Sequence, residues 1–261
     1  MSNLPVLGLA VGTIMALTGA GGGILAVPLL VFGAGIGVAQ AGPIGLLAVG
    51  MAATLGAVLG LKAGIVRYRA ALLIAAAGTL AAPCGLWLAR RIDNHWLMLF
   101  FSLVLLYVAV RTARQALGLV PAVVAQADPP CIRGAGGRFV WTSACARSLA
   151  LSGSIAGLLS GLLGVGGGFV MVPALQRCTD LAMQSVVATS LAVIALVSAS
   201  SVIASAATMD WGVALPFAGG ALSGMLAGRL VSARLAGPHL QLGFAAVAAL
   251  VAVGMVAKAV L

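Results

Sequence analysis

Two glycine-rich phrases have the residue types and spacing that could do chemistry in this chain. They occupy residues 19–30 and 164–175, and seven of their twelve positions are identical at an offset of 145. Each phrase lies inside a long apolar stretch, where consecutive glycines interrupt a helix. An interrupted helix survives in hydrocarbon only where its bare N–H and C=O groups are buried in protein or line a wet cavity. Two matching breaks therefore predict a pathway for a polar solute.

The chemistry predicted at each break is anion binding. Residues 24–31 and 169–175 are expected to form short helices that begin at the glycines. The first N–H groups of such a helix, and the positive end of its dipole, attract anions. An alternative also stays open, in which the glycines only allow helices to pack closely.

Hydroxyl groups close to the breaks could complete an anion site. Thr18 precedes the first break, Ser160 precedes the second, and Thr189 and Ser190 lie in the next apolar segment. Hydroxyl and backbone N–H donors, without a fixed positive charge, would hold a small oxyanion loosely enough to release it. The alternative is that these hydroxyls bond to their own helix or to a neighbouring one. Cys178 is kept as a possible substrate contact.

The remaining reactive side chains exclude several classes of function. All four acidic residues lie at segment ends or in the linker, which argues against a cation site and against proton coupling through a buried carboxylate. The four cysteines have no metal-binding or disulfide spacing and are expected to be mostly small packing residues. No serine lies in a GxSG motif and both histidines lie at membrane edges, so neither an enzyme nor a cofactor is expected.

Composition indicates an integral membrane protein built from helices. The chain is 62% hydrophobic and 7% charged, with a mean hydropathy of +1.21. Its 14 basic residues form short clusters at segment ends, a pattern that sets membrane orientation and does not indicate nucleic-acid binding. No cleaved signal peptide is expected. The predicted apolar segments are residues 4–33, 44–61, 70–88, 96–118, 147–176, 183–205, 212–230 and 239–260.

The chain is predicted to hold two copies of one unit in a single membrane domain. The first repeat covers residues 1–118, a linker covers 119–146, and the second repeat covers 147–261. If each glycine break is the tip of a re-entrant hairpin, all basic residues except Arg90, Arg91 and Lys258 fall on one side. Full crossings would give a weaker bias, so the hairpins are favoured. The repeats are then inverted, both termini lie outside the cytoplasm, and the two turns meet near the bilayer midplane.

The second glycine phrase, followed by Ala188-Thr189-Ser190-Leu191 and Met209-Asp210-Trp211, resembles the TauE/SafE family of membrane transporters, the sulfite exporter group. The resemblance extends along nearly the whole chain. It implies transport of small sulfur-containing or organic anions, such as sulfite, thiosulfate or sulfonates, across the bacterial cytoplasmic membrane. It also implies substrate-binding roles for Gly21, Gly22, Gly23, Pro28, Gly166, Gly167, Gly168, Pro173, Thr189 and Ser190.

The first half departs from the family pattern at two places. Gly45 to Leu47 stand where a Thr-Ser pair is expected, and Arg67 stands where an acidic residue precedes an aromatic one. The site is therefore expected to be asymmetric.

The leading hypothesis is an anion transporter whose two repeats rock around a midplane site formed by the glycine turns. The alternatives are a passive anion channel and, less favoured, an intramembrane hydrolase. Partners are the small anionic substrate and the lipid bilayer. The sequence leaves the oligomeric state, the transported anion, the direction of transport and the driving force open.

Overall fold

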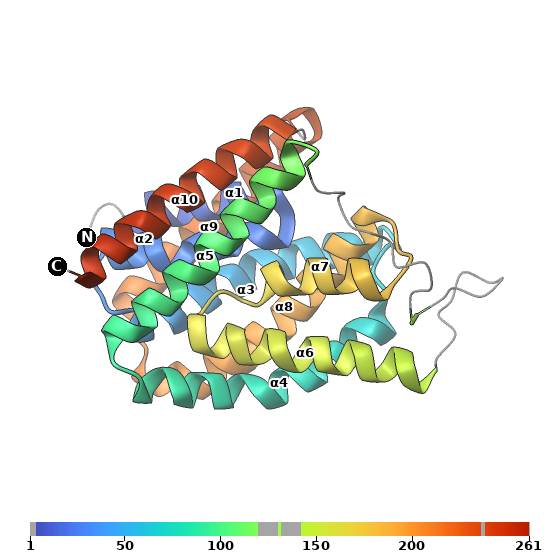
Figure 1. Ribbon diagram of the computed structural model, residues 1–261, viewed down its shortest axis with the longest axis horizontal. Coiled ribbons are helices and arrows are strands. Elements are labelled where there is room, and N and C mark those ends of the chain that lie inside the picture. Colours follow the sequence, from blue (N-terminus) through green and yellow to red (C-terminus); the bar gives the residue numbers. More distant parts are fainter. Residues whose placement is uncertain (1–3, 120–129, 132–141, 236–237, 261) are drawn as a thin grey trace.

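The computed structural model describes residues 4–119, 130–131, 142–235 and 238–260, which are helical almost throughout (Figure 1). Side chains of residues 18–21, 230–241 and 259–260 are also outside this description. The first half contains α1 (Leu4–Thr18), the 3₁₀ helix η1 (Gly19–Leu25), α2 (Ala26–Gly33), α3 (Val38–Lys62), α4 (Tyr68–Arg91) and α5 (Asn94–Ala116). The second half contains α6 (Ser143–Leu163), α7 (Gly168–Cys178), α8 (Met183–Ser205), the 3₁₀ helix η2 (Ala206–Thr208), α9 (Trp211–Leu235) and α10 (Pro238–Val260).

The helical membrane class predicted from the sequence is confirmed. Within the described ranges, six helices are long and apolar enough to cross a bilayer, namely α3, α4, α5, α6, α8 and α9. Shorter apolar helices are α1, the stretch from Gly22 to Gly33, and the Leu242–Lys258 part of α10. Each predicted apolar segment therefore corresponds to one helix, or to two helices separated by a glycine phrase.

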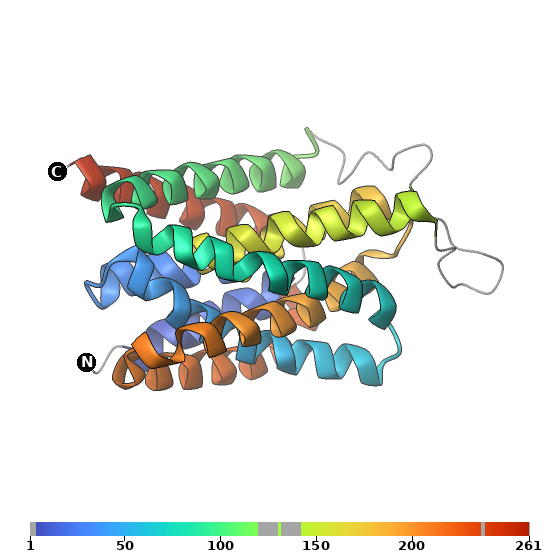
Figure 2. The same ribbon diagram turned by 90° about the horizontal axis from the view of Figure 1, so that it is seen from below.

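Helices of the two halves pack together in pairs. The helix α1 packs along α9, and α4 packs along α6. Two further pairs also pack together, α3 with α8 and α5 with α10. Figure 2 shows α5 and α10 side by side along one edge of the molecule.

Glycines bring the α1–α9 and α4–α6 pairs into backbone contact. A β-carbon added to Gly12 would collide with the carbonyl of Ala221 on α9, and one added to Gly157 would collide with the carbonyl of Gly78 on α4. Gly12 and Gly157 are 145 residues apart, the offset of the glycine phrases. Small residues in such positions let membrane helices approach closely and gain van der Waals contact.

The short helices α2 and α7 extend in opposite directions from the middle of the bundle (Figure 1). The helix α2 runs toward the end that carries both termini, and α7 runs toward the other end. The helix ends at the terminus-bearing end carry Arg90 and Arg91 of α4 and Lys258 of α10 (Figure 1). The helix ends at the opposite end carry most of the other described basic residues, namely Lys62 of α3, Arg67 and Arg69 at the start of α4, Arg111 and Arg114 of α5, Arg147 of α6 and Arg177 of α7.

The cysteine spacing signals no disulfide framework, and the structure corrects this for one pair. Cys131 and Cys145 form a disulfide, with their Cα atoms 4.9 Å apart. Cys131 also donates its N–H to the carbonyl of Cys178 at 3.1 Å and forms an isolated bridge with Thr179. The pairing depends on the path that brings the linker back to the end of α7, which cysteine spacing does not reveal.

Candidate anion-binding site

The second glycine phrase forms a sharp turn between α6 and α7. Gly164, Gly166 and Gly167 have φ angles of +71°, +77° and +67°, a left-handed conformation that side chains disfavour. The turn reverses the chain, so α7 starts inside the bundle. Its N-cap, Gly167, makes no side-chain hydrogen bond. Gly168 and Phe169 lie in the first turn of α7, so their amides have no carbonyl one turn earlier in the helix to donate to.

The first glycine phrase has a different conformation. It forms the 3₁₀ helix η1, and neither Gly22 nor Gly23 has a positive φ. The sequences differ at one telling position, because Ala20, a strong helix former, stands where the second phrase has the β-branched Val165. The two phrases therefore differ in backbone conformation, whereas the asymmetry expected from residues 45–47 and Arg67 stays a prediction. The side chain of Thr18 lies outside the described residues.

The two glycine phrases lie against each other and against α3. A β-carbon built on Gly23 would lie 3.2 Å from the carbonyl oxygen of Val165 and 3.0 Å from Cγ1 of Val49. One built on Gly166 would also lie 3.0 Å from Cγ1 of Val49. Val49 therefore lies against both phrases, and a β-carbon at either glycine would require its side chain to shift.

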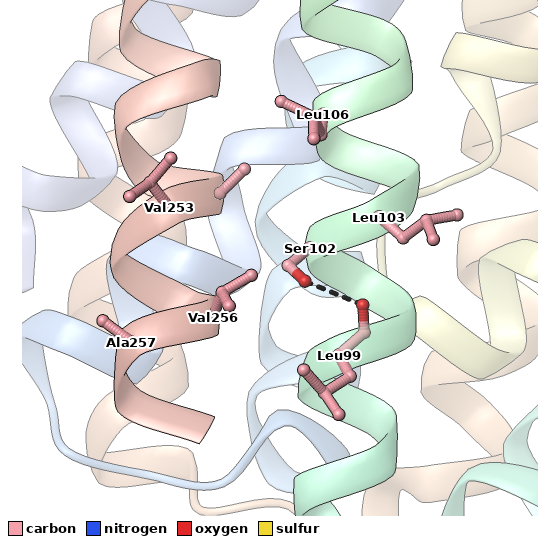
Figure 3. A pocket seen from close by; sticks show the side chains of 8 residues that line it. Leu99, Ser102, Leu103, Leu106, Val253, Val256 and Ala257 are labelled. Atoms are coloured by element: carbon pink, nitrogen blue, oxygen red, sulfur yellow. Dashed lines mark hydrogen bonds between the residues drawn. The ribbon is translucent and has the colours of Figure 1, made fainter. Parts of the chain in front are cut away.

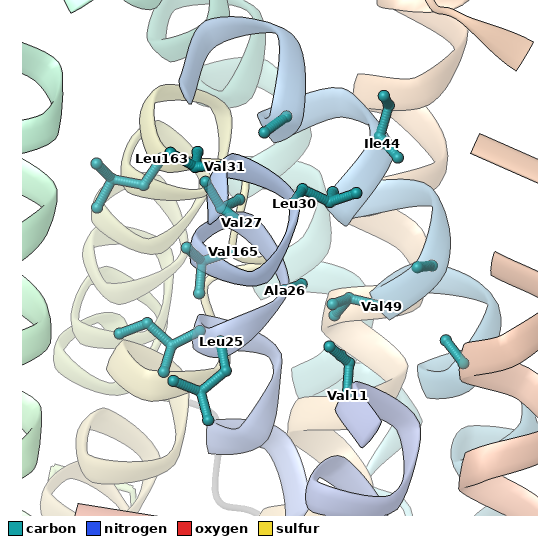
Figure 4. Close-up of a cluster of buried hydrophobic side chains, with 14 of the residues drawn as sticks. Val11, Leu25, Ala26, Val27, Leu30, Val31, Ile44, Val49, Leu163 and Val165 are labelled. Atoms are coloured by element: carbon teal, nitrogen blue, oxygen red, sulfur yellow. The ribbon is translucent and has the colours of Figure 1, made fainter. Parts of the chain in front are cut away.

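Apolar side chains surround this meeting point. Figure 4 shows Val27 and Leu30 of α2 lying between Leu163 and Val165 on one side and α3 on the other. Pro28 is buried in the same helix. Pro173 lies inside α7, where it cannot donate a hydrogen bond to the carbonyl of Phe169.

Among the residues that the structure describes, three buried hydroxyl groups have no hydrogen-bond partner. They belong to Ser160 on α6 and to Ser190 and Ser198 on α8, and all three residues are at most 1% exposed. Ser160 lies one turn before Gly164, whose N–H donates to the Ser160 carbonyl at 2.8 Å. Ser198 was not singled out from the sequence. The only sequence signal for it is the run of serines at 198, 200 and 201 inside an apolar helix.

Thr189 contacts a loop and not the glycine turn. Its hydroxyl accepts a hydrogen bond from the backbone N–H of Arg67 at 3.1 Å, at the junction of α3 and α4. Arg67 is the N-cap of α4, and its Nε atom is buried without a partner. The equivalent Asp210 instead accepts a hydrogen bond from the N–H of Gly212 at 2.9 Å.

Cys178 lies at the far end of α7 from the glycine turn. Its carbonyl is bonded to the N–H of Cys131, so the structure places it beside the linker disulfide. The structure does not bring Cys178 together with the glycines.

A separate apolar groove of about 620 Å³ lies between α5 and α10 (Figure 3). Leu103 and Leu106 line it from α5, and Val253 and Val256 line it from α10. Its one hydroxyl, that of Ser102, donates to the carbonyl of Leu99 in its own helix at 2.7 Å. The groove therefore offers no free donor to an anion.

The charge around the glycine phrases is low. Every buried polar side chain in the described ranges is a serine or a threonine, and the described charged residues lie toward helix ends. The donors available to a solute are therefore hydroxyls and backbone amides, which bind anions by partial charges alone.

Comparison with known proteins identifies the family. Residues 4–255 match the family described as Sulfite exporter TauE/SafE. This chain belongs to the TauE/SafE family. It is 31% identical over 235 residues to a "Probable membrane transporter protein" of Xylella fastidiosa strain 9a5c, covering 88% of this chain and 84% of the relative. A protein of the same description from strain Temecula1 is 30% identical over the same shares of both chains. No solved structure matches the sequence.

The family resemblance drawn from the second glycine phrase is thus confirmed, and the chain is a multi-pass membrane transporter of the TauE/SafE family. Membership in a transporter family fits the expectation that the protein is not an enzyme.

Proposed function

We propose that this TauE/SafE protein carries small sulfur-containing oxyanions or organosulfonates across the bacterial cytoplasmic membrane by alternating access around the glycine phrases. The observation that carries the proposal is the contact between the two phrases at Val49, beside the start of α7 and two unpartnered serine hydroxyls. Backbone amides at a helix start and free hydroxyls together are donors suited to oxyanion oxygens. The bacterial relatives support the membrane assignment.

The helix contacts support an inverted repeat, an architecture that fits alternating access. In such a repeat, α1 corresponds to α6 and α4 corresponds to α9, so the α1–α9 pair corresponds to the α6–α4 pair. The pairs α3–α8 and α5–α10 each join two corresponding helices. The opposite directions of α2 and α7 fit two hairpins that enter from opposite faces. In such transporters one bundle rocks against the other around a fixed midplane site formed by broken helices.

The roles within the site follow from position. The amides of residues 166–168 contact the anion from the second phrase, the hydroxyl of Ser160 contacts it from α6, and Gly21, Gly22 and Gly23 line the opposite wall. Ser190 adds a buried hydroxyl from α8, whereas Thr189 positions the α3–α4 junction by its bond to Arg67.

The test compares two glycine-to-alanine variants in which the left-handed backbone conformation costs the same free energy. Gly167 and Gly64 have φ angles of +67° and +69°, so alanine at either costs about 1–2 kcal/mol in the left-handed region. A β-carbon at Gly64 meets nothing within 4 Å, but one at Gly167 lies 2.7 Å from the carbonyl oxygen of Ala156. We expect Gly167→Ala to lower anion flux at least tenfold and Gly64→Ala to transport normally.

Flux is measured in proteoliposomes with ³⁵S-labelled sulfite, thiosulfate and methanesulfonate, after both variants are shown to insert and to elute as folded protein. A carrier gives saturable flux that is accelerated by anion on the opposite side. Linear flux without such acceleration would support the passive channel instead. Equal transport by the two variants would contradict a role for the second glycine turn.

A further inference from the structure

The hydroxyl of Ser198 differs from those of its neighbours on α8. Ser200 and Ser201 both donate to the carbonyl of Val197, at 2.8 Å and 3.1 Å, and Ser205 donates to the carbonyl of Ser201 at 2.7 Å. Such a bond to the preceding turn is the usual arrangement for serine in an apolar helix. Ser198 is 1% exposed and makes no hydrogen bond.

The free hydroxyl of Ser198 lies beside the second glycine turn. Its Oγ atom is 3.7 Å from the position that a β-carbon on Gly166 would occupy, and 3.5 Å from the corresponding position on Gly50 of α3. Because Gly50 and Gly166 have no side chains, their backbone atoms lie close to the Ser198 hydroxyl. Gly166 stands two residues before α7, whose first amides also lack partners within the helix.

A buried hydroxyl without a partner is costly, about 1–3 kcal/mol, and such groups are rare in folded proteins. Alanine would avoid this cost at position 198. A free hydroxyl in the second half of α8, beside the start of α7, therefore has a physical reason if a solute supplies the missing acceptor.

We propose that Ser198 donates a hydrogen bond to the transported anion at the α7 N-terminus, and that this site selects singly charged oxyanions with an apolar substituent. This inference rests on the proposed transport function and assigns a residue and a charge class to its site.

The charge class follows from the surroundings of Gly166. The methyl groups Cγ2 of Ile194 and Cγ1 of Val49 each lie 3.0 Å from its β-carbon position, and no buried residue in the described ranges is charged. Removing an ion from water costs more as its charge increases, because the Born energy grows with the square of the charge. Partial charges on amides and hydroxyls offset this cost more readily for a monoanion than for a dianion. The apolar wall then fits an alkyl group.

The test compares methanesulfonate with sulfate, two tetrahedral probes that differ by one charge and by a methyl group in place of an oxygen. Thermal unfolding of the purified protein in detergent is followed across a concentration series of each salt, with chloride at matched ionic strength. We expect wild type to be stabilised saturably by methanesulfonate and not by sulfate beyond the chloride effect. In Ser198→Ala the midpoint concentration for methanesulfonate should rise about tenfold or more.

The matched control is Ser201→Ala, three residues along the same buried helix, whose hydroxyl already has a partner. It should keep the wild-type response to methanesulfonate. Ser198→Ala without ligand should melt at the wild-type temperature or above, since it removes an unpaired buried group; a purely structural serine would melt lower.

Three results would overturn the inference. An unchanged midpoint in Ser198→Ala, while Gly167→Ala loses the response, would remove Ser198 from the site but leave the proposed transport intact. Equal stabilisation of wild type by sulfate and methanesulfonate would overturn the charge selectivity. No response and no flux with sulfite, thiosulfate or methanesulfonate would remove both the inference and the proposed function.

Discussion

At the residue scale, Ser160 gives a second test of the hydroxyl donors. Its carbonyl accepts the Gly164 N–H, but its hydroxyl is buried and unpartnered. Ser160→Ala should therefore leave the melting temperature unchanged or raise it, because it removes an unpaired polar group. It should weaken methanesulfonate binding by about tenfold, the effect of one hydrogen bond to a charged group.

The control for Ser160 lies two turns earlier on the same helix. Ser152 donates its hydroxyl to the carbonyl of Ser148 at 2.7 Å, so Ser152→Ala should leave binding unchanged. Both variants are measured by the same thermal titration. A lower melting temperature with unchanged binding in Ser160→Ala would assign this serine to packing alone.

Site residues could be predicted from the sequence where the backbone conformation requires an unusual residue type. Gly166 and Gly167 repeat an earlier phrase in an unfavourable setting, and their positive φ angles explain why glycine is needed. Ser198 could not be recognised in this way, because hydrogen bonding by a helical serine depends on its neighbours in space. Thr189 was placed in the right helix, but its partner, the Arg67 amide, depends on how the α3–α4 junction folds.

At the element scale, the close helix pairs predict a matched effect at equivalent glycines. Gly12→Ala and Gly157→Ala each place a methyl group on a carbonyl of the partner helix, so each should lower the free energy of unfolding by about 1–3 kcal/mol. Gly219 on α9 is exposed with nothing within 4 Å, so Gly219→Ala should instead stabilise by about 1 kcal/mol.

The measurement is unfolding by sodium dodecyl sulfate in mixed micelles, followed by circular dichroism. Similar losses at positions 12 and 157 would support equivalence of the two helix pairs. A loss at only one position would show that the pairs differ in energy despite their similar contacts.

Elements were predictable where hydrophobic length decides them. The segment 183–205 coincides with α8, and its neighbours differ from their helices by a few residues. The internal geometry of the breaks was not predictable, because both phrases contain the same glycines. The structure separates them into a 3₁₀ helix and a left-handed turn, and among the first five residues of each phrase only Ala20 and Val165 differ.

At the scale of the whole molecule, charge and disulfide position bear on the same question of orientation. Most described basic side chains lie toward the end opposite the termini, which the positive-inside rule assigns to the cytoplasm. The disulfide between Cys131 and Cys145 connects the linker with the start of α6 at that same end. Cytoplasmic glutathione and thioredoxin keep such cysteines reduced, so we expect the disulfide to form only after the cells are broken open or when an oxidant is added.

Fusions to the C-terminus test this orientation. Because the terminus-bearing end holds only Arg90, Arg91 and Lys258 among the described basic side chains, we expect it to face the periplasm. Alkaline phosphatase fused there should be active and green fluorescent protein should be dark, whereas the same reporters inserted at Gly64 should give the reverse. In acid-quenched cells, Cys131 and Cys145 should react with maleimide as free thiols. A fluorescent C-terminal fusion together with a disulfide that resists labelling in cells would invert the assignment, placing the linker and α7 on the periplasmic side.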